Sequence, residues 1–232
     1  MKFIHYTLGI LFSFCLTITL LITSVEAVVY WTPGYFEQEY SKYNVTADVH
    51  MEMDDLLEVT DEMMAYLRGN REDLHVPTVV DGQPREFFNE REIAHMEDVR
   101  GLFLAALTIR RICVITAVLC IAALALLKAP ITTVLPASIC VGTGLFFAIV
   151  CALAAVISTN FTKYFVIFHK IFFNNDLWIL DPATDLLINI VPEPFFVDTA
   201  AAIGITFGAS IAIIFLICFI WMKKSKKKSL QA

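Results

Sequence analysis

Charged residues are scarce in this chain: Asp, Glu, Lys and Arg make up 17% of its 232 residues, whereas hydrophobic residues make up 58%. Soluble globular domains are about a quarter charged and about half apolar, so this composition excludes an ordinary soluble enzyme. Cysteine is absent from the polar segments, because the six cysteines all lie within apolar runs. The sequence therefore offers neither a disulfide framework nor a cysteine-ligated metal site, and each cysteine is predicted to be a small core residue.

Four long apolar runs organise the chain, and each exceeds the roughly 20 residues needed to cross the hydrocarbon layer of a bilayer. We therefore predict an all-α membrane protein with four transmembrane helices, at residues 1–29, 101–128, 131–158 and 200–222. A cleaved signal peptide is the alternative for the first run, since Lys2 and the segment 25–27 imitate its charged region and cleavage site. The apolar core is longer than that of most signal peptides, which favours a helix that is retained.

The charge distribution predicts the orientation of the chain. Five lysines lie in the tail at 223–232, and the positive-inside rule keeps such a cluster in the cytoplasm. An even number of spans then places the N-terminus on the same side. The segments 30–100 and 159–199 are therefore expected outside the membrane, on its outer face.

The first outer segment is strongly acidic, with 17 of the 23 acidic residues of the chain between residues 30 and 100. Apolar residues at helical spacing predict a helix over 46–67, which Gly69-Asn70 ends. Turns are indicated at Val76-Pro77 and Asp81-Gly82, and a second helix is expected to start near Glu86 and to continue into the next span. This segment is predicted to form a small α-rich cap.

The second outer segment, 159–199, is rich in aromatic residues. Those between 161 and 173 recur at spacings of three and four, which gives a helix with one aromatic face that lies at the membrane interface. The later part, 178–196, mixes β-branched residues with three prolines. Its sequence leaves open whether it forms a short strand or an extended lid.

His95 has the richest chemical context among the five histidines. Glu92 and Asp98 each lie three residues away and share its helical face. Such a carboxylate can accept a hydrogen bond from one ring nitrogen, which fixes the tautomer and leaves the other nitrogen as a base. One alternative takes Glu92-x-x-His95 as half of a di-metal carboxylate site, but the further long helices with inward glutamates are missing. A solvated charged face is the other alternative, and the spacing alone does not separate them.

Two segments carry a resemblance to a known family. They are residues 87–100, FFNEREIAHMEDVR, and residues 168–196, FHKIFFNNDLWILDPATDLLINIVPEPFF. Together with the four spans they resemble the Lit family of bacterial lipoprotein intramolecular transacylases. The resemblance implies an enzyme of the bacterial plasma membrane that moves the sn-2 acyl chain of a diacylglyceryl-modified lipoprotein cysteine onto the α-amino group of the same cysteine. It also implies that His95 and His169 are the catalytic pair, and that lipoproteins and membrane lipids are the partners.

The reaction can be divided into tasks for individual residues. A histidine deprotonates the amine. The oxyanion that forms when the amine attacks the ester calls for a positive charge or donor, which is either Arg100 or the imidazolium. Arg110 interrupts a span, so it is expected to face away from lipid or to snorkel toward the headgroups. Glu92, Asp98 and Asp176 complete the set of residues expected to support catalysis or to bind substrate. No cofactor, metal or nucleic acid is required.

Two other classes of protein stay open at this stage. A small transporter would need polar residues that face one another across several spans, and the spans contain chiefly Ser and Thr besides two arginines. A non-enzymatic membrane sensor or assembly factor fits the composition equally well, and only the resemblance argues against it. In the last span, Gly204 and Gly208 form a small-xxx-small pair that predicts close helix packing.

Overall fold

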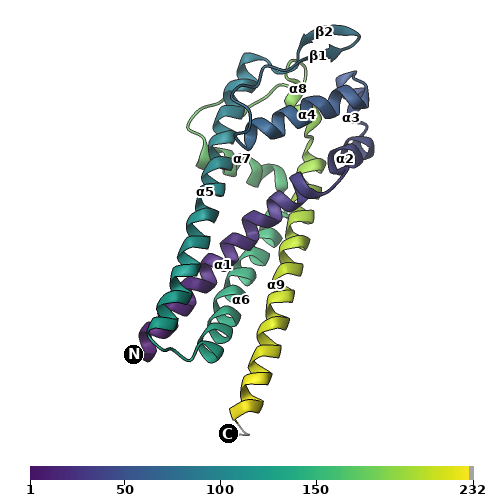
Figure 1. Cartoon of the computed structure of the whole chain (residues 1–232). Coiled ribbons are helices and arrows are strands. Elements are labelled where there is room, and N and C mark those ends of the chain that lie inside the picture. The colour runs from purple at the N-terminus through teal and green to yellow at the C-terminus, as the bar shows by residue number, and fades with distance from the viewer. Residues whose placement is uncertain (230–232) are drawn as a thin grey trace. The chain divides into compact units, whose positions relative to one another are not determined.

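The computed structural model describes residues 1–229, which divide into two units (Figure 1). The first, which we call the transmembrane unit, contains Met1–Val25, Leu107–Thr159 and the described chain after Ala202. The second, which we call the polar unit, contains Glu26–Ala106 and Asn160–Ala202. The last three residues of the predicted tail, 230–232, lie outside the described residues.

Nine helices and one two-stranded hairpin make up the described chain. In chain order they are α1 (Lys2–Trp31), α2 (Tyr35–Tyr43), α3 (Val45–Val49), α4 (Met53–Leu67), β1 (Pro77–Val80), β2 (Gln83–Glu86), α5 (Glu90–Leu126), α6 (Ile131–Ile157), α7 (Phe161–Phe172), α8 (Leu186–Ile190) and α9 (Glu193–Ser229).

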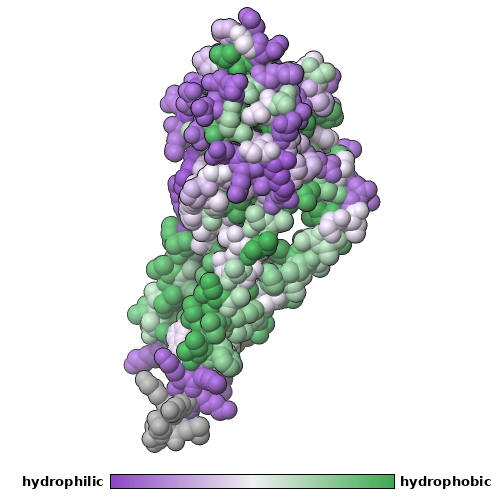
Figure 2. Space-filling view, turned by 90° about the vertical axis from the view of Figure 1, so that its right-hand side faces the viewer, coloured by the Kyte–Doolittle hydropathy of each residue, from purple (hydrophilic) through white to green (hydrophobic). Residues whose placement is uncertain are grey.

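Four of these helices, α1, α5, α6 and α9, are long and apolar enough to cross a membrane, which confirms the predicted all-α fold with four transmembrane helices. Most of their apolar side chains point outward: Val118 and Leu119 of α5 are 60% and 62% exposed, and Leu145 of α6 is 64% exposed. Hydrophobic side chains accordingly cover the surface of this unit in Figure 2. Helices that are apolar on all sides are suited to contact lipid.

One buried hydrophobic cluster of the transmembrane unit consists of Leu124, Val134, Leu135, Ile139 and Cys218, with Leu8, Phe12 and Trp221 packed against it. The prediction that every cysteine is a core residue is wrong for Cys151, which is exposed. Lipid-facing and core positions are both apolar in a membrane protein, so an apolar run does not distinguish them.

Small and hydroxylated residues bring α1 and α6 together. Thr17 donates a hydrogen bond to the Ser13 carbonyl at 2.8 Å, and its Oγ1 lies 3.0 Å from Thr143 Oγ1. A Cβ at Gly142 would lie 2.5 Å from Ser13 Oγ, so the helices approach too closely for any larger residue there. The close packing predicted at Gly204 is not found, since a Cβ there would meet no atom within 4 Å.

The polar unit contains the predicted α-rich segment with two changes. The helix expected over 46–67 is broken between α3 and α4, where His50 takes a left-handed backbone with φ of 53°. The turn predicted at Asp81-Gly82 closes a hairpin whose register pairs Pro77 with Glu86. The turn predicted at Val76-Pro77 is not found, because Pro77 is the first residue of β1. Asp81 and Gly82 both have positive φ, which matches the tight turn that an Asp-Gly pair favours.

The segment 159–199 contains the expected aromatic helix, α7, and a second short helix. Asn160 caps α7, because its Oδ1 accepts a hydrogen bond from the backbone N–H of Lys163 at 3.0 Å. The later part contains no strand: residues 178–185 form a loop, and α8 and the first turn of α9 follow. Pro194 explains this outcome, since proline fits the first turn of a helix and its sequence neighbour Glu193 begins α9.

Candidate active site

The site is built on the first turns of α5. Asn89 caps this helix, and its Oδ1 accepts the backbone N–H groups of Arg91 and Glu92 at 2.9 and 3.0 Å. In return, Glu92 Oε2 accepts the Asn89 N–H at 2.7 Å, which completes a capping box. The other carboxylate oxygen, Oε1, accepts the N–H of Leu187 at 2.6 Å and so ties the start of α8 to the start of α5. His95 follows one turn later on this fixed helix.

Two histidines come together at this point. The ring centroids of His95 on α5 and His169 on α7 are 6.1 Å apart and their planes are inclined by 35°. Both side chains are buried, at 7% and 6% exposed. The structure therefore brings together the two residues that the sequence predicts to be catalytic, although 73 residues separate them in the chain.

The ring of His169 has a defined tautomer. Its Nδ1 lies 2.8 Å from the carbonyl oxygen of Phe165. A carbonyl oxygen can only accept, so Nδ1 carries the proton and, in the neutral ring, Nε2 carries the lone pair. The Nδ1 atom of His95, in contrast, is buried and has no hydrogen-bond partner among the described residues.

Burial keeps both histidines neutral. His95 belongs to the polar unit and precedes the apolar part of α5. Burial lowers its pKa to about 4; nearby His169 adds to this shift, and Asp98 opposes it. Burial also lowers the pKa of His169, and the hydrogen bond to Phe165 works in the opposite direction. Near pH 7 both rings are therefore uncharged and each carries a lone pair.

Aromatic side chains enclose the histidines. The ring centroid of Phe173 is 5.3 Å from that of His95, and the centroid of Trp178 is 4.9 Å from that of His169. Phe165 also packs against His169, with centroids 4.1 Å apart. These rings exclude water from the imidazoles, and this desolvation is the main cause of the lowered pKa values.

The turn formed by residues 173–179 is anchored to α5 on both sides of His95. Arg91, four residues before it, donates a hydrogen bond to the carbonyl of Asp176. Asp98, three residues after it, accepts one from Asn175 Nδ2 at 2.8 Å. The carbonyl of Asn175 in turn accepts the indole N–H of Trp178 at 3.0 Å. Asp98 thus fixes the ring that lies against His169.

Glu92 and Asp98 do not accept the hydrogen bond that was expected from a ring nitrogen of His95. Both oxygens of Glu92 accept backbone N–H groups, and Asp98 Oδ2 accepts from Asn175. Among the residues that the structure describes, neither carboxylate is hydrogen-bonded to His95. Glu92 is fully buried, and burial raises its pKa while the N–H groups of Leu187 and Asn89 lower it. Both residues position the histidines indirectly.

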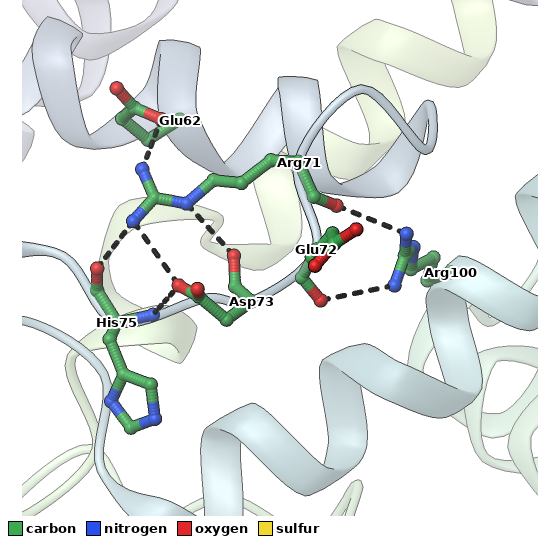
Figure 3. Close-up of polar contacts among 6 residues, drawn as sticks. All are labelled: Glu62, Arg71, Glu72, Asp73, His75 and Arg100. Carbon is green, nitrogen blue, oxygen red and sulfur yellow. Dashed lines mark hydrogen bonds and ion pairs between the residues drawn. The ribbon is translucent and has the colours of Figure 1, made fainter.

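Arg100 is engaged away from the histidines. Its guanidinium donates to the carbonyl of Arg71 at 3.0 Å (Figure 3). The guanidinium also lies over the ring of Tyr66, 4.6 Å from its centroid. Arg71 itself binds Glu62 and the carbonyl of His75, as Figure 3 also shows. The two arginines together hold the loop between α4 and β1. The proposed role of Arg100 as an oxyanion donor gains no support from this arrangement.

Two further residues, Asp176 and Arg110, were predicted to support catalysis or to bind substrate. Asp176 lies on the anchored turn near the histidines, with an exposed side chain. Arg110 belongs to the transmembrane unit, so its role in the reaction stays a prediction. No group of three or more His, Cys, Asp or Glu side chains within residues 1–229 is arranged to hold a metal ion.

Asn89, Asn175 and Trp178 were not predicted as site residues. A signal for Asn89 exists in the sequence, because Asn-x-x-Glu directly before an apolar helix is a capping pattern. Asn175 gives no such signal, since its partner Asp98 lies 77 residues away in the chain.

A comparison with protein families decides what kind of site this is. The model of the family described as lipoprotein intramolecular transacylase Lit matches residues 10–196. The chain belongs to the Lit family. Membership in this family of transacylases identifies an enzyme and decides against the transporter and the sensor as classes. None of the curated proteins matches the chain significantly in sequence.

Solved structures of a Lit protein have the same fold. The membrane-integral lipoprotein intramolecular transacylase Lit from Bacillus cereus is 23% identical, with a TM-score of 0.82 over 98% of this chain and 100% of that chain. A form of it with a histidine replaced by arginine is 23% identical, with a TM-score of 0.79 over 98% and 96% of the two chains. A third form has alanine at that histidine and is 22% identical, with a TM-score of 0.79 over 97% of each chain.

Proposed function

We propose that this Lit-family protein transfers the sn-2 acyl chain of a diacylglyceryl-modified lipoprotein cysteine to the α-amino group of that cysteine, with His95 and His169 as catalytic residues. The observation that carries the proposal is the buried pair of neutral imidazoles, 6.1 Å apart and enclosed by aromatic rings. A neutral imidazole is the side chain best suited to accept and return a proton near pH 7.

His169 is the base in this scheme. Its Nδ1–H is held by the Phe165 carbonyl, so the lone pair on Nε2 is the one available to take a proton from the amine. This requires an amine that has already lost the proton of its ammonium form, which has an ordinary pKa of about 7.7 to 8.0. The amine nitrogen forms a bond to the ester carbonyl carbon, and the ester C–O bond then breaks.

In the same scheme, His95 acts on the oxygen atoms of the ester. The imidazole donates a hydrogen bond to the oxyanion and to the departing glycerol oxygen, which finally receives the proton that His169 removed from nitrogen. An amide and a secondary alcohol result, so protons and bonds balance without water or a second substrate. The amine and ester belong to one molecule and close a ring of about eight atoms, so the main task of the enzyme is to hold them together.

The proposal also includes an orientation of the chain in the membrane. The lysines at the end of α9 favour a cytoplasmic C-terminus, and the four membrane-length helices then put the polar unit on the outer face. The exposed apolar side chains of α7, which include Ile171 at 71% and Phe172 at 52%, suit a helix at the interface of the outer leaflet. The sn-2 ester of a membrane-anchored lipoprotein lies at this depth.

The test uses purified protein and a synthetic diacylglyceryl lipopeptide, with N-acylation measured by mass spectrometry. His95→Ala and His169→Ala should each lower turnover by about 100-fold or more, because general acid–base catalysis contributes factors of this size. His75→Ala is the matched control, since His75 belongs to the same unit and is exposed. Activity at the level of the parent in His169→Ala would remove the proposed base.

A further inference from the structure

A pocket of about 520 Å³ lies beside the two histidines, within the polar unit. Its walls come from α7 and from the anchored turn that follows: Val166, Lys170, Phe173, Asn174, Asp176 and Trp178. Neither histidine lines it. An amine and an ester held at the histidines therefore do not account for this pocket.

The pocket shares two aromatic walls with the catalytic pair. Phe173 contacts the rings of both histidines, with centroids 5.3 Å from His95 and 5.4 Å from His169. Trp178 stacks on His169 at 4.9 Å. In the substrate, the α-amino group and the carbonyl that begins the following peptide are attached to the same carbon atom. A substrate with its amine at the histidines therefore has its peptide within reach of this pocket.

The polar groups of the pocket match a peptide main chain. The ammonium of Lys170 donates hydrogen bonds, the carboxylate of Asp176 accepts them, and the amide of Asn174 does both. A peptide presents N–H and C=O groups in alternation and uses both kinds of partner. A phosphate only accepts, and Asp176 repels it. The exposed apolar face of α7, with Ile167 and Ile171, lies on the same helix and suits the acyl chains instead.

We propose that this pocket binds the main chain of the residues that directly follow the lipidated cysteine. The proposal rests on the proposed function and adds a peptide subsite to it. A volume of 520 Å³ falls within the range of pockets that hold drug-sized ligands, so it accommodates a few residues. The anchored turn that fixes Trp178 also forms the floor for the peptide, which links substrate binding to the position of His169.

The experiment varies the length of the peptide. The parent protein is assayed with diacylglyceryl-cysteine amide and with lipopeptides that carry one to four residues after the cysteine. The ratio kcat/KM should rise by about tenfold over the first three residues and then stay constant, which is the effect of one or two added hydrogen bonds. Lys170→Ala and Asn174→Ala should each reduce this gain to about threefold or less.

Lys163→Ala is the matched control, because Lys163 is an exposed lysine of the same helix that does not line the pocket. It should retain the full tenfold gain. Transfer that is equally fast for all peptide lengths would overturn the peptide subsite and leave the proposed function intact. If transfer does not depend on peptide length but is accelerated by added phosphatidylethanolamine, the pocket binds a zwitterionic headgroup and the peptide subsite is wrong. No transfer from any lipopeptide would overturn both proposals.

Discussion

At the scale of single residues, the two histidines differ in how their rings are held. The Phe165 carbonyl fixes the proton of His169 on Nδ1, whereas the Nδ1 of His95 is buried without a partner among the described residues. A buried polar atom that lacks a hydrogen bond is costly for the folded state. The polar groups of the substrate are suited to satisfy it. This asymmetry is the basis for assigning the base to His169 and the donor to His95.

The lowered pKa of His95 predicts a pH-dependent stability. Between about pH 6.5 and its folded pKa of about 4, the unfolded chain binds a proton that the folded chain does not. The stability due to neutral His95 is therefore complete above pH 6.5 and is lost as the pH falls toward 4. In thermal unfolding in detergent, the loss of stability over this range should be smaller by about 3 kcal/mol in His95→Gln than in the parent, and the part due to His169 should remain. An equal pH dependence in parent and His95→Gln would mean that burial does not shift the pKa of His95.

The histidine pair illustrates what can be predicted from the sequence at the scale of single residues. His95 and His169 were identified through the resemblance to the Lit family, and the structure brings them together. The roles of the carboxylates were less predictable. Glu92 shares a helical face with His95, yet a capping box and the N–H of Leu187 occupy its oxygens. Spacing along a helix indicates which side chains share a face, but distant segments decide which of them form hydrogen bonds.

At the scale of elements, the anchored turn between α7 and α8 connects the helices that carry the histidines. Asn175 is the central residue, since its side chain donates to Asp98 and its carbonyl accepts from Trp178. Asn175→Asp would place a second carboxylate against Asp98, and the repulsion should move the turn. We expect kcat to fall by about tenfold or more at neutral pH, with a change in Trp178 fluorescence.

A second substitution, made in the Asn175→Asp variant, tests whether the contact between residues 98 and 175 positions the turn. Asp98→Asn combined with Asn175→Asp restores one donor and one acceptor with their places exchanged, so it should recover most of the lost activity. Asp98→Asn alone should have a mild effect, because an amide oxygen still accepts from Asn175. A double variant that is as impaired as Asn175→Asp would show that the contact between these two side chains is not what positions Trp178.

The helices were more predictable than their interruptions. Apolar runs of membrane length gave the four long helices, and α6 begins and ends within one residue of its predicted bounds. The break at His50 and the later start of α5 at Glu90 depend on local backbone choices that periodicity does not contain. The close packing of Gly142 against Ser13 was also missed, because a small residue shows only that close approach is possible.

At the scale of the whole molecule, the orientation in the membrane decides whether the proposed reaction can reach its substrate. The proposed reaction on diacylglyceryl-modified lipoproteins requires the polar unit to face outward. The evidence for this orientation is the lysine-rich end of α9 together with the four helices of membrane length. The native cysteines all lie in the membrane-length helices, which makes introduced cysteines useful reporters of sidedness.

Cysteines introduced singly at Ser41 and Ala183 should react with a membrane-impermeant thiol reagent on intact cells, because both positions are exposed in the polar unit. A cysteine at Ser225, beside the lysines at the end of α9, should react only after the cells are opened. The protein without introduced cysteines gives the background, with Cys151→Ala as a further control for the one exposed native thiol. Labelling of Ser225→Cys alone on intact cells would place both histidines in the cytoplasm, away from the lipoproteins that the proposed reaction requires.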